Sequence, residues 1–122
     1  MSRFVIRTLA SGVKFDLKAT NGQTIASSEV YATLAACRNG MESVRKNGPT
    51  APVEDQTLPD CKALPNPKFE LYQDKAGHYR FRLKAKNGRI IAVSEGYATK
   101  AACENGIESV RTNAGDAEME TE

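Results

Sequence analysis

The chain is built on a tandem repeat. Residues 13–47, VKFDLKATNGQTIASSEVYATLAACRNGMESVRKN, recur with few changes as residues 79–113, YRFRLKAKNGRIIAVSEGYATKAACENGIESVRTN. A repeated unit often cannot bury its apolar face alone and needs its copy to cover it. We therefore expect the two copies to pack against each other.

The length of the chain supports a shared core. The chain has 122 residues, and a unit of about 65 residues is near the lower limit for an independent hydrophobic core. We predict one compact domain over residues 1–122, with repeat one at 3–56, a linker at 57–68 and repeat two at 69–122. We expect a monomer with an internal pseudo-two-fold axis.

The composition is that of an ordinary globular protein, with 40% hydrophobic and 26% charged residues. No apolar run approaches the roughly 18 residues needed to span a bilayer. The first residues lack the basic segment and long apolar stretch of a signal peptide. We expect a cytoplasmic protein with no membrane association.

Strands are predicted from alternation. Residues 13–19 and 79–85 alternate apolar and polar side chains, as a strand buried on one face does. Each repeat also begins with a short apolar segment, led by Phe4 or Phe69, that predicts a preceding strand.

An Asn-Gly pair follows the second predicted strand of each repeat, at residues 21–22 and 87–88. These pairs predict two-residue type I′ hairpin turns, in which both central residues have positive φ. The resulting register places Leu83 opposite Ala92 on the inner face of the sheet and Lys84 opposite Ile91 on the outer face.

A helix is predicted after each third strand. Thr33 and Thr99 are placed to accept a hydrogen bond from the first free amides of a helix. A stripe of apolar or small residues with helical spacing follows in each copy: Ala36, Cys37, Gly40, Met41 and Val44, then Ala102, Cys103, Gly106, Ile107 and Val110. Because glycine inside a helix costs about 1 kcal/mol relative to alanine, the glycines at 40 and 106 indicate close approach of helix and sheet.

The repeat continues past the helices, where residues 51–54 align with residues 117–120 and predict short edge strands. Pro52 fits only at a sheet edge or at a position that makes no ladder hydrogen bond. The next segment, QTLPDCKALPNPK, holds three of the five prolines and predicts a linker.

These motifs together resemble those of the YegP-like family of small bacterial proteins, catalogued as a domain of unknown function. The resemblance covers both copies and rests on NG, SExY and CxNGxESVxxN in the same order. It implies an α+β fold of two tandem β-β-β-α-β repeats that form one antiparallel sheet, with both helices on one face and exchanged C-terminal strands. It implies no function.

Exchange of the last strands would bury Val53 and Met119, each contributing roughly 1.5–3 kcal/mol if fully covered. A single repeat is then expected to be unstable. Val30 stands where the second copy has Gly96, so the two copies are not equivalent everywhere.

No catalytic residue, metal site or cofactor is predicted. Cys37 and Cys103 occupy equivalent core positions, and Cys61 lies in the linker without a CxxC or histidine nearby, so three reduced thiols are expected. His78 is the only histidine and falls in a turn, which leaves no imidazole pair for metal or nucleophilic chemistry. The glycines fall in turns and helices and form no phosphate-binding loop.

Three polar positions are identical in the two copies: Glu29 and Glu95, Asn39 and Asn105, and Glu42 and Glu108. One interpretation is a site shared across the pseudo-two-fold. A structural role, with Glu29 against Lys14 and Glu95 against Arg80, explains them more simply.

Charge gives the one indication of a partner. Residues 1–48 carry 7 Lys and Arg against 3 acids, and residues 69–112 carry 8 against 5. Five basic residues are predicted to cluster on the outer face of the second hairpin, with Ile91 and Val93 beside them: Arg80, Arg82, Lys84, Lys86 and Arg89. Such a surface is typical of a polyanion site, and the water-facing side of any antiparallel sheet has a similar composition.

The leading functional hypothesis is therefore a small non-enzymatic interaction or accessory module that works through its sheet face or edges, with a protein or nucleic acid as partner. Polyanion or nucleic-acid binding through the basic outer face is the alternative, and an enzyme comes third. A ligand in a cleft between the repeats would instead favour a small-molecule role.

Overall fold

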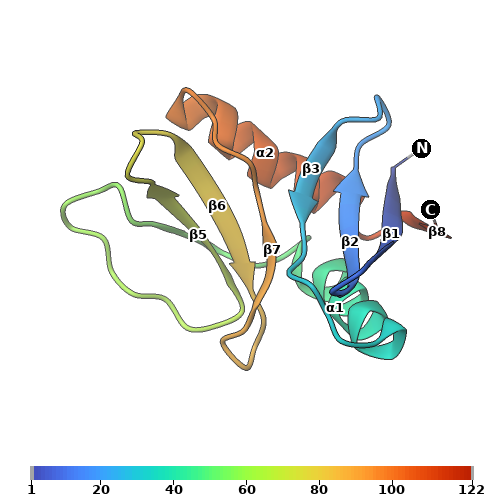
Figure 1. The fold of residues 1–122 in the computed structure, drawn as a ribbon. Coiled ribbons are helices and arrows are strands. Elements are labelled where there is room, and N and C mark those ends of the chain that lie inside the picture. The colour runs from blue at the N-terminus through green and yellow to red at the C-terminus, as the bar shows by residue number, and fades with distance from the viewer. Residues whose placement is uncertain (1, 122) are drawn as a thin grey trace.

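The computed structural model describes residues 2–121 and has one eight-stranded sheet with two helices packed on one face (Figure 1). Repeat one contains β1 (Arg3–Leu9), β2 (Gly12–Lys18), β3 (Thr24–Ser27), α1 (Leu34–Asn47) and β4 (Val53–Asp55). Repeat two contains β5 (Lys68–Gln73), β6 (Tyr79–Lys84), β7 (Ile90–Val93), α2 (Lys100–Asn113) and β8 (Glu118–Thr121). The predicted α+β class and β-β-β-α-β order are confirmed.

The strand order is β4-β5-β6-β7-β3-β2-β1-β8, so the last strand of each repeat lies at the edge of the other repeat. The predicted exchange is confirmed. The six inner strands pair antiparallel, whereas the exchanged strands pair in parallel, β4 with β5 and β8 with β1.

The repeats meet at β3 and β7, where Ser27 pairs with Val93. These two positions are equivalent in the repeats, 66 residues apart. Because a residue that pairs with its own counterpart lies on a two-fold axis, the pseudo-two-fold passes between these strands.

One interior serves both repeats. Phe4, Phe15, Phe69 and Phe81 are each 0% exposed and form edge-to-face pairs within each repeat. Helix α1 packs on β2 of its own repeat and on β7 of the other, and α2 likewise packs on β6 and β3. Each helix therefore covers part of both halves of the sheet.

The helices begin where predicted. Thr33 Oγ1 accepts a hydrogen bond from the Ala36 amide, and Thr99 Oγ1 accepts one from the Ala102 amide, both at 3.1 Å. Each helix has 14 residues, and neither of these described helices is long and apolar enough to cross a membrane.

The helical glycines stand at points of close approach, as predicted. A Cβ at Gly106 would lie 2.6 Å from Tyr97 Oη and 2.9 Å from Phe81 Cε2. At Gly40 the same space is filled by the ring of Tyr31. The obstacle is thus a tyrosine that follows the third strand, together with a core phenylalanine on the sheet.

The predicted type I′ turns are wrong. Gly22 and Gly88 have φ of +85° and +84°, and no described non-glycine residue has positive φ. The Gly22 amide donates to Ala19 O, and the Ala19 amide donates to Gln23 O, both at 2.9 Å, which makes a three-residue loop with a glycine bulge. Asn21 supports this turn with its side chain, because Oδ1 accepts from the Gln23 amide at 3.0 Å.

The bulge changes the end of the predicted register. Leu83 still lies opposite Ala92, but Lys84 pairs with Ile90 instead of Ile91. Ile91 is 5% exposed and belongs to the core. Its predicted place among the basic side chains of the outer face is therefore wrong.

The predicted burial of Val53 and Met119 is also wrong, since these side chains are 36% and 46% exposed. Both lie on edge strands with a neighbouring strand on one side only, and Val53 lines a groove beside α2. The residues before these strands, Ala51 and Ala117, are buried instead, at 2% and 3% exposure. The exchange thus rests on backbone pairing and charged contacts more than on large apolar side chains.

Candidate ligand-binding cleft

The basic residues predicted as a polyanion site are mostly paired within the protein. Arg80 Nε donates to Asp74 Oδ2 at 2.6 Å, and Arg82 Nε donates to Glu70 Oε1 at 2.6 Å. The Arg82 guanidinium also lies over the ring of Tyr72, 4.6 Å from its centroid. Both arginines of β6 are therefore held against the sheet.

The other three predicted basic residues are spread over two regions. Lys84 Nζ lies 3.5 Å from Glu70 Oε2 on the outer face, whereas Arg89 Nη2 lies 3.2 Å from Glu29 Oε1 near α1. Lys86 is exposed and makes no side-chain hydrogen bond or ion pair with another residue in 2–121. The outer face consequently presents little uncompensated positive charge.

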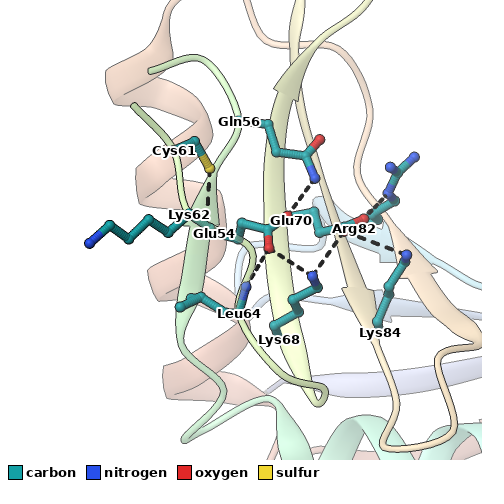
Figure 2. Close-up of polar contacts among 9 residues, drawn as sticks. All are labelled: Glu54, Gln56, Cys61, Lys62, Leu64, Lys68, Glu70, Arg82 and Lys84. Carbon is teal, nitrogen blue, oxygen red and sulfur yellow. Dashed lines mark hydrogen bonds and ion pairs between the residues drawn. The ribbon is translucent and has the colours of Figure 1, made fainter. Parts of the chain in front are cut away.

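Next to these bases lies a buried charge cluster that sequence reasoning missed (Figure 2). Glu54 accepts hydrogen bonds from Lys68 Nζ and the Leu64 amide, both at 2.7 Å, and from Gln56 Nε2 at 2.6 Å. Glu54, Lys68 and Glu70 are 5%, 8% and 4% exposed. These donors, Lys68 first, lower the pKa of Glu54 to about 2.

This cluster joins the exchanged strand to its new neighbour. Glu54 lies on β4 of repeat one, and Lys68 lies on β5 of repeat two. The equivalent pair in the other half, Glu120 on β8 and Arg3 on β1, is 2.9 Å apart, with side chains 57% and 33% exposed. Only the first pair is covered by the linker, through Leu64. Because the donors around Glu54 belong to the protein itself, we regard the cluster as structural.

A cleft of about 410 Å³ lies where α1 of repeat one meets the β6–β7 hairpin of repeat two. One wall is formed by residues 29–32 and one side of α1, and the other by residues 85–91. Its size falls within the range of about 300–1,000 Å³ that is common for small-molecule sites. The cleft exists only because the two repeats pack together.

An ion pair joins the two walls. Glu29 Oε1 accepts from Arg89 Nη2 at 3.2 Å, with the side chains 50% and 67% exposed. An exposed pair of this kind typically contributes about 0.2–1 kcal/mol, so either group is available to a ligand at low cost. The predicted pairing of Glu29 with Lys14 is wrong, because Lys14 Nζ lies 3.5 Å from Asp16.

Neutral polar groups line the helix side of the cleft. Asn39 is exposed, and its side chain makes no hydrogen bond within the described chain. The Tyr31 ring is stacked on Phe15, with centroids 6.4 Å apart. Burial, and then the charge of Glu29, raise the pKa of Tyr31, so its hydroxyl is neutral at pH 7. The cleft thus offers an amide and a phenol beside one ion pair.

The rim of the cleft is apolar. Val30 and Ile90 are 44% and 36% exposed, although both are large hydrophobic residues. Exposed apolar side chains beside convergent polar groups are typical of a ligand-binding site.

Repeat two carries the same helix wall but faces a different hairpin. The positions of Glu29, Tyr31, Asn39 and Ser43 are held by Glu95, Tyr97, Asn105 and Ser109. The positions of Val30, Arg89 and Ile90 are held by Gly96, Gln23 and Thr24. The side chain of Glu95 makes no hydrogen bond or salt bridge with any residue in the described range. The ion pair and the apolar rim are therefore specific to one of the two related positions.

Sequence reasoning singled out two residues of this cleft, but as part of a site shared with Glu95 and Asn105, which do not line it. Among the polar positions identical in both copies, Glu29 and Asn39 do line one cavity, whereas Glu42 pairs with Arg45 on the surface of α1. Val30 and Ile90 also line this cavity and were not singled out from the sequence. The sequence did contain a signal for them, because both belong to the positions at which the two repeats differ: Val30 against Gly96, and Ile90 against Thr24.

The thiols and the histidine lie outside the cleft. Cys37 and Cys103 are each 0% exposed, and burial raises the pKa of Cys103 to about 11. Cys61 is exposed in the linker, and the His78 side chain is 53% exposed in the β5–β6 turn. Residues 2–121 contain no group of three or more His, Cys, Asp or Glu placed to hold a metal ion.

Comparison with known proteins places the chain in a family. The family model described as "Domain of unknown function (DUF1508)" matches residues 10–55 and 74–120, one match in each repeat. The chain belongs to the DUF1508 family. The predicted YegP-like resemblance is confirmed, since "UPF0339 protein YegP" of Yersinia pestis is 41% identical over 99 residues, which cover 81% of this chain and 75% of that protein.

Other DUF1508 relatives cover one or both repeats. "UPF0339 protein in ptx operon 5'region" of Stutzerimonas stutzeri is 36% identical over 110 residues, covering 90% of this chain and 86% of the relative. A "UPF0339 protein" of Treponema denticola is 64% identical over 50 residues, covering 41% of this chain and 86% of the relative, so it is about one repeat long.

The fold is also known from experiment. The solution NMR structure of the "protein of unknown function yegP from E. coli" matches with a TM-score of 0.81 and 30% identity, covering 98% of this chain and 91% of that one. The names of these relatives state no activity, and the family itself is described as one of unknown function.

Proposed function

We propose that this DUF1508 protein is a non-enzymatic binding module of the cytoplasm, and that its ligand is a small organic molecule held between α1 and the β6–β7 hairpin. The observation that carries the proposal is the cleft itself, where an exposed apolar rim meets a charged pair and two neutral polar groups. One chain supplies both walls, so no second chain is needed. The three free cysteines fit a reducing compartment.

Binding without turnover is supported by the chemistry of the walls. Ser43 accepts a hydrogen bond from Asn47 Nδ2 at 3.2 Å, and an amide cannot take up the proton of a nucleophilic hydroxyl. Tyr31 has a raised pKa, which makes it a poor base at neutral pH. Neither Ser43 nor Tyr31 is therefore an activated nucleophile or a base at neutral pH.

Polyanion binding through the outer face has less support. Arg80 and Arg82 already donate to the carboxylates of Asp74 and Glu70 at 2.6 Å, so a phosphate at either arginine would also meet a neighbouring negative charge. Of the five predicted bases, only Lys86 has no side-chain partner within residues 2–121, and a single phosphate contact contributes little affinity.

A fragment screen by NMR tests the proposed function. Amide shifts of the full-length protein are recorded with a library of small polar and apolar molecules, and saturable shifts are expected at residues 29–31 and 89–91. Ala36 lies on α1 in the cleft wall, so Ala36→Phe should abolish them by filling the cavity. Ala102→Phe, at the equivalent position of α2, is the matched control. The proposal fails if no fragment shifts these amides, or if both variants respond alike.

A further inference from the structure

The charges of the cleft restrict the ligand that suits it. Glu29 and Arg89 face each other at 3.2 Å, one negative and one positive. A ligand with a single negative charge would pair with Arg89 but lie beside the Glu29 carboxylate, and a single positive charge would have the reverse conflict. A zwitterion gives each side chain an opposite charge.

The polar geometry favours a carboxylate as the negative group. A guanidinium binds a carboxylate through two parallel N–H donors, and Arg89 is 67% exposed with one nitrogen engaged by Glu29. An ammonium group has three donors, which suit the Glu29 carboxylate together with the Asn39 side-chain oxygen in the same cleft.

The apolar rim defines the rest of the ligand. Val30 and Ile90 stand exposed beside the ion pair, and an aliphatic group placed against them would remove their surface from water. The equivalent position in the other half has Gly96 and Thr24 there, and Gln23 in place of Arg89. The related surface between α2 and the hairpin of repeat one therefore lacks both the cation and the two apolar side chains. We expect one ligand site per chain.

We infer that the cleft binds an aliphatic α-amino acid, with its carboxylate on Arg89, its ammonium group on Glu29 and its side chain against Val30 and Ile90. This inference rests on the proposed binding function of the cleft. Binding replaces the ion pair between the two walls by two ion pairs to the ligand, so no charge is left without a partner.

The test is an NMR titration of the full chain with L-leucine and two matched analogues. 4-Methylpentanoate lacks only the ammonium group of leucine, and 3-methylbutylamine lacks only its carboxylate. L-Leucine should shift the amides of residues 29–31 and 89–91 saturably at one site per chain. Each analogue should bind at least tenfold more weakly. Equal binding of leucine and either analogue overturns the inference.

Substitutions test whether Arg89 and Glu29 each hold one charge of the ligand. Arg89→Gln, which copies Gln23 of the other repeat, and Glu29→Gln should each weaken leucine binding at least tenfold. Glu95→Gln, the equivalent change outside the cleft, should leave it unchanged. Loss of binding in all three variants, or in none, overturns the assignment.

The fragment screen separates the two proposals. If leucine produces no shift while other fragments still shift the cleft amides, the amino-acid inference is wrong and the proposed function stands. If nothing shifts these amides, both are wrong.

Discussion

Glu54 falls in a predicted edge strand, where an acidic side chain would be expected to face water. In the structure three hydrogen-bond donors surround its carboxylate, and the residue is only 5% exposed. Desolvation of a carboxylate is costly unless it is paired. The cation that offsets this cost is Lys68, whose pKa is raised chiefly by its hydrogen bond to Glu54. Removing one partner of this buried pair is therefore expected to cost more stability than the same change in its exposed counterpart, Arg3 and Glu120.

Lys68→Met should destabilise the protein by about 3 kcal/mol at pH 7, because it leaves the buried Glu54 charge without its cation. Arg3→Met, the matched change in the other repeat, should cost less than about 1 kcal/mol, since that pair is exposed. Urea unfolding of both variants measures the difference. Equal costs would show that the linker does not bury the Glu54 pair in solution.

The pH dependence of stability provides a control for this prediction. The pKa of Glu54 is about 2 in the folded protein, against about 4.3 for an unfolded chain. Its stabilising contribution is therefore complete above about pH 5 and is lost as the pH falls towards 2. In Lys68→Met this loss should be smaller, because removal of the cation moves the folded pKa back towards the unfolded value.

At the scale of elements, the turn between the first two strands of each repeat contacts the residue that follows the third strand, which is Val30 in repeat one and Gly96 in repeat two. The shape of that turn determines how large this residue can be. Gly12 has φ of +146°, and a Cβ there would collide with the Tyr31 carbonyl oxygen and would also lie 2.8 Å from Val30 Cγ1. In repeat two the loop is one residue longer and Gly77 takes the positive φ. His78 then follows with a side chain, and a Cβ at Gly96 would lie 2.9 Å from His78 Cβ. Repeat one thus pairs a glycine in the turn (Gly12) with a large residue after the third strand (Val30). Repeat two has the reverse, His78 in the turn and Gly96 after the strand.

Gly96→Val alone should therefore destabilise the protein by about 1–3 kcal/mol through overpacking. Adding His78→Gly should recover more than half of this cost, since it removes the atom in contact. His78→Ala should not, because alanine keeps the Cβ. A double-mutant cycle from urea unfolding measures the coupling, and additive costs would contradict the prediction.

The elements themselves could be predicted because they depend on local patterns. Alternation predicted the strands, and Thr33 and Thr99 predicted the helix starts. The turn type could not, since Asn-Gly suits both a two-residue turn and a three-residue loop with a glycine bulge. That choice moved Ile91 into the core. The exposure of Val53 also escaped prediction, because a sequence pattern does not show where the sheet extends beyond its helices.

At the scale of the whole molecule, each half of the sheet is completed by a strand from the other half. Residues 63–122 expressed alone would leave β5 without β4 and β8 without β1. We expect this fragment to fold only as a dimer, with an unfolding midpoint that depends on concentration. Light scattering and urea unfolding check this, and co-expression with residues 1–62 should restore a one-to-one complex. A cooperative monomer of either half would contradict the fold-level argument.

The candidate cleft was only partly predictable because it depends on contacts between distant residues. Arg89 was predicted as a cation of the sheet surface, but its partner Glu29 lies 60 residues away. The two meet because β3 pairs with β7 across the pseudo-two-fold. Repetition predicted that the halves join, but it did not specify which walls would face each other.

Two similar repeats in one chain can differ in sequence, whereas the subunits of a symmetric dimer cannot. In a symmetric dimer of identical subunits, every substitution appears twice and alters both related surfaces together. Here Arg89 and Gln23, or Val30 and Gly96, are encoded separately. One of the two related surfaces can therefore change its side chains while the other stays as it is, and the shared backbone architecture is kept.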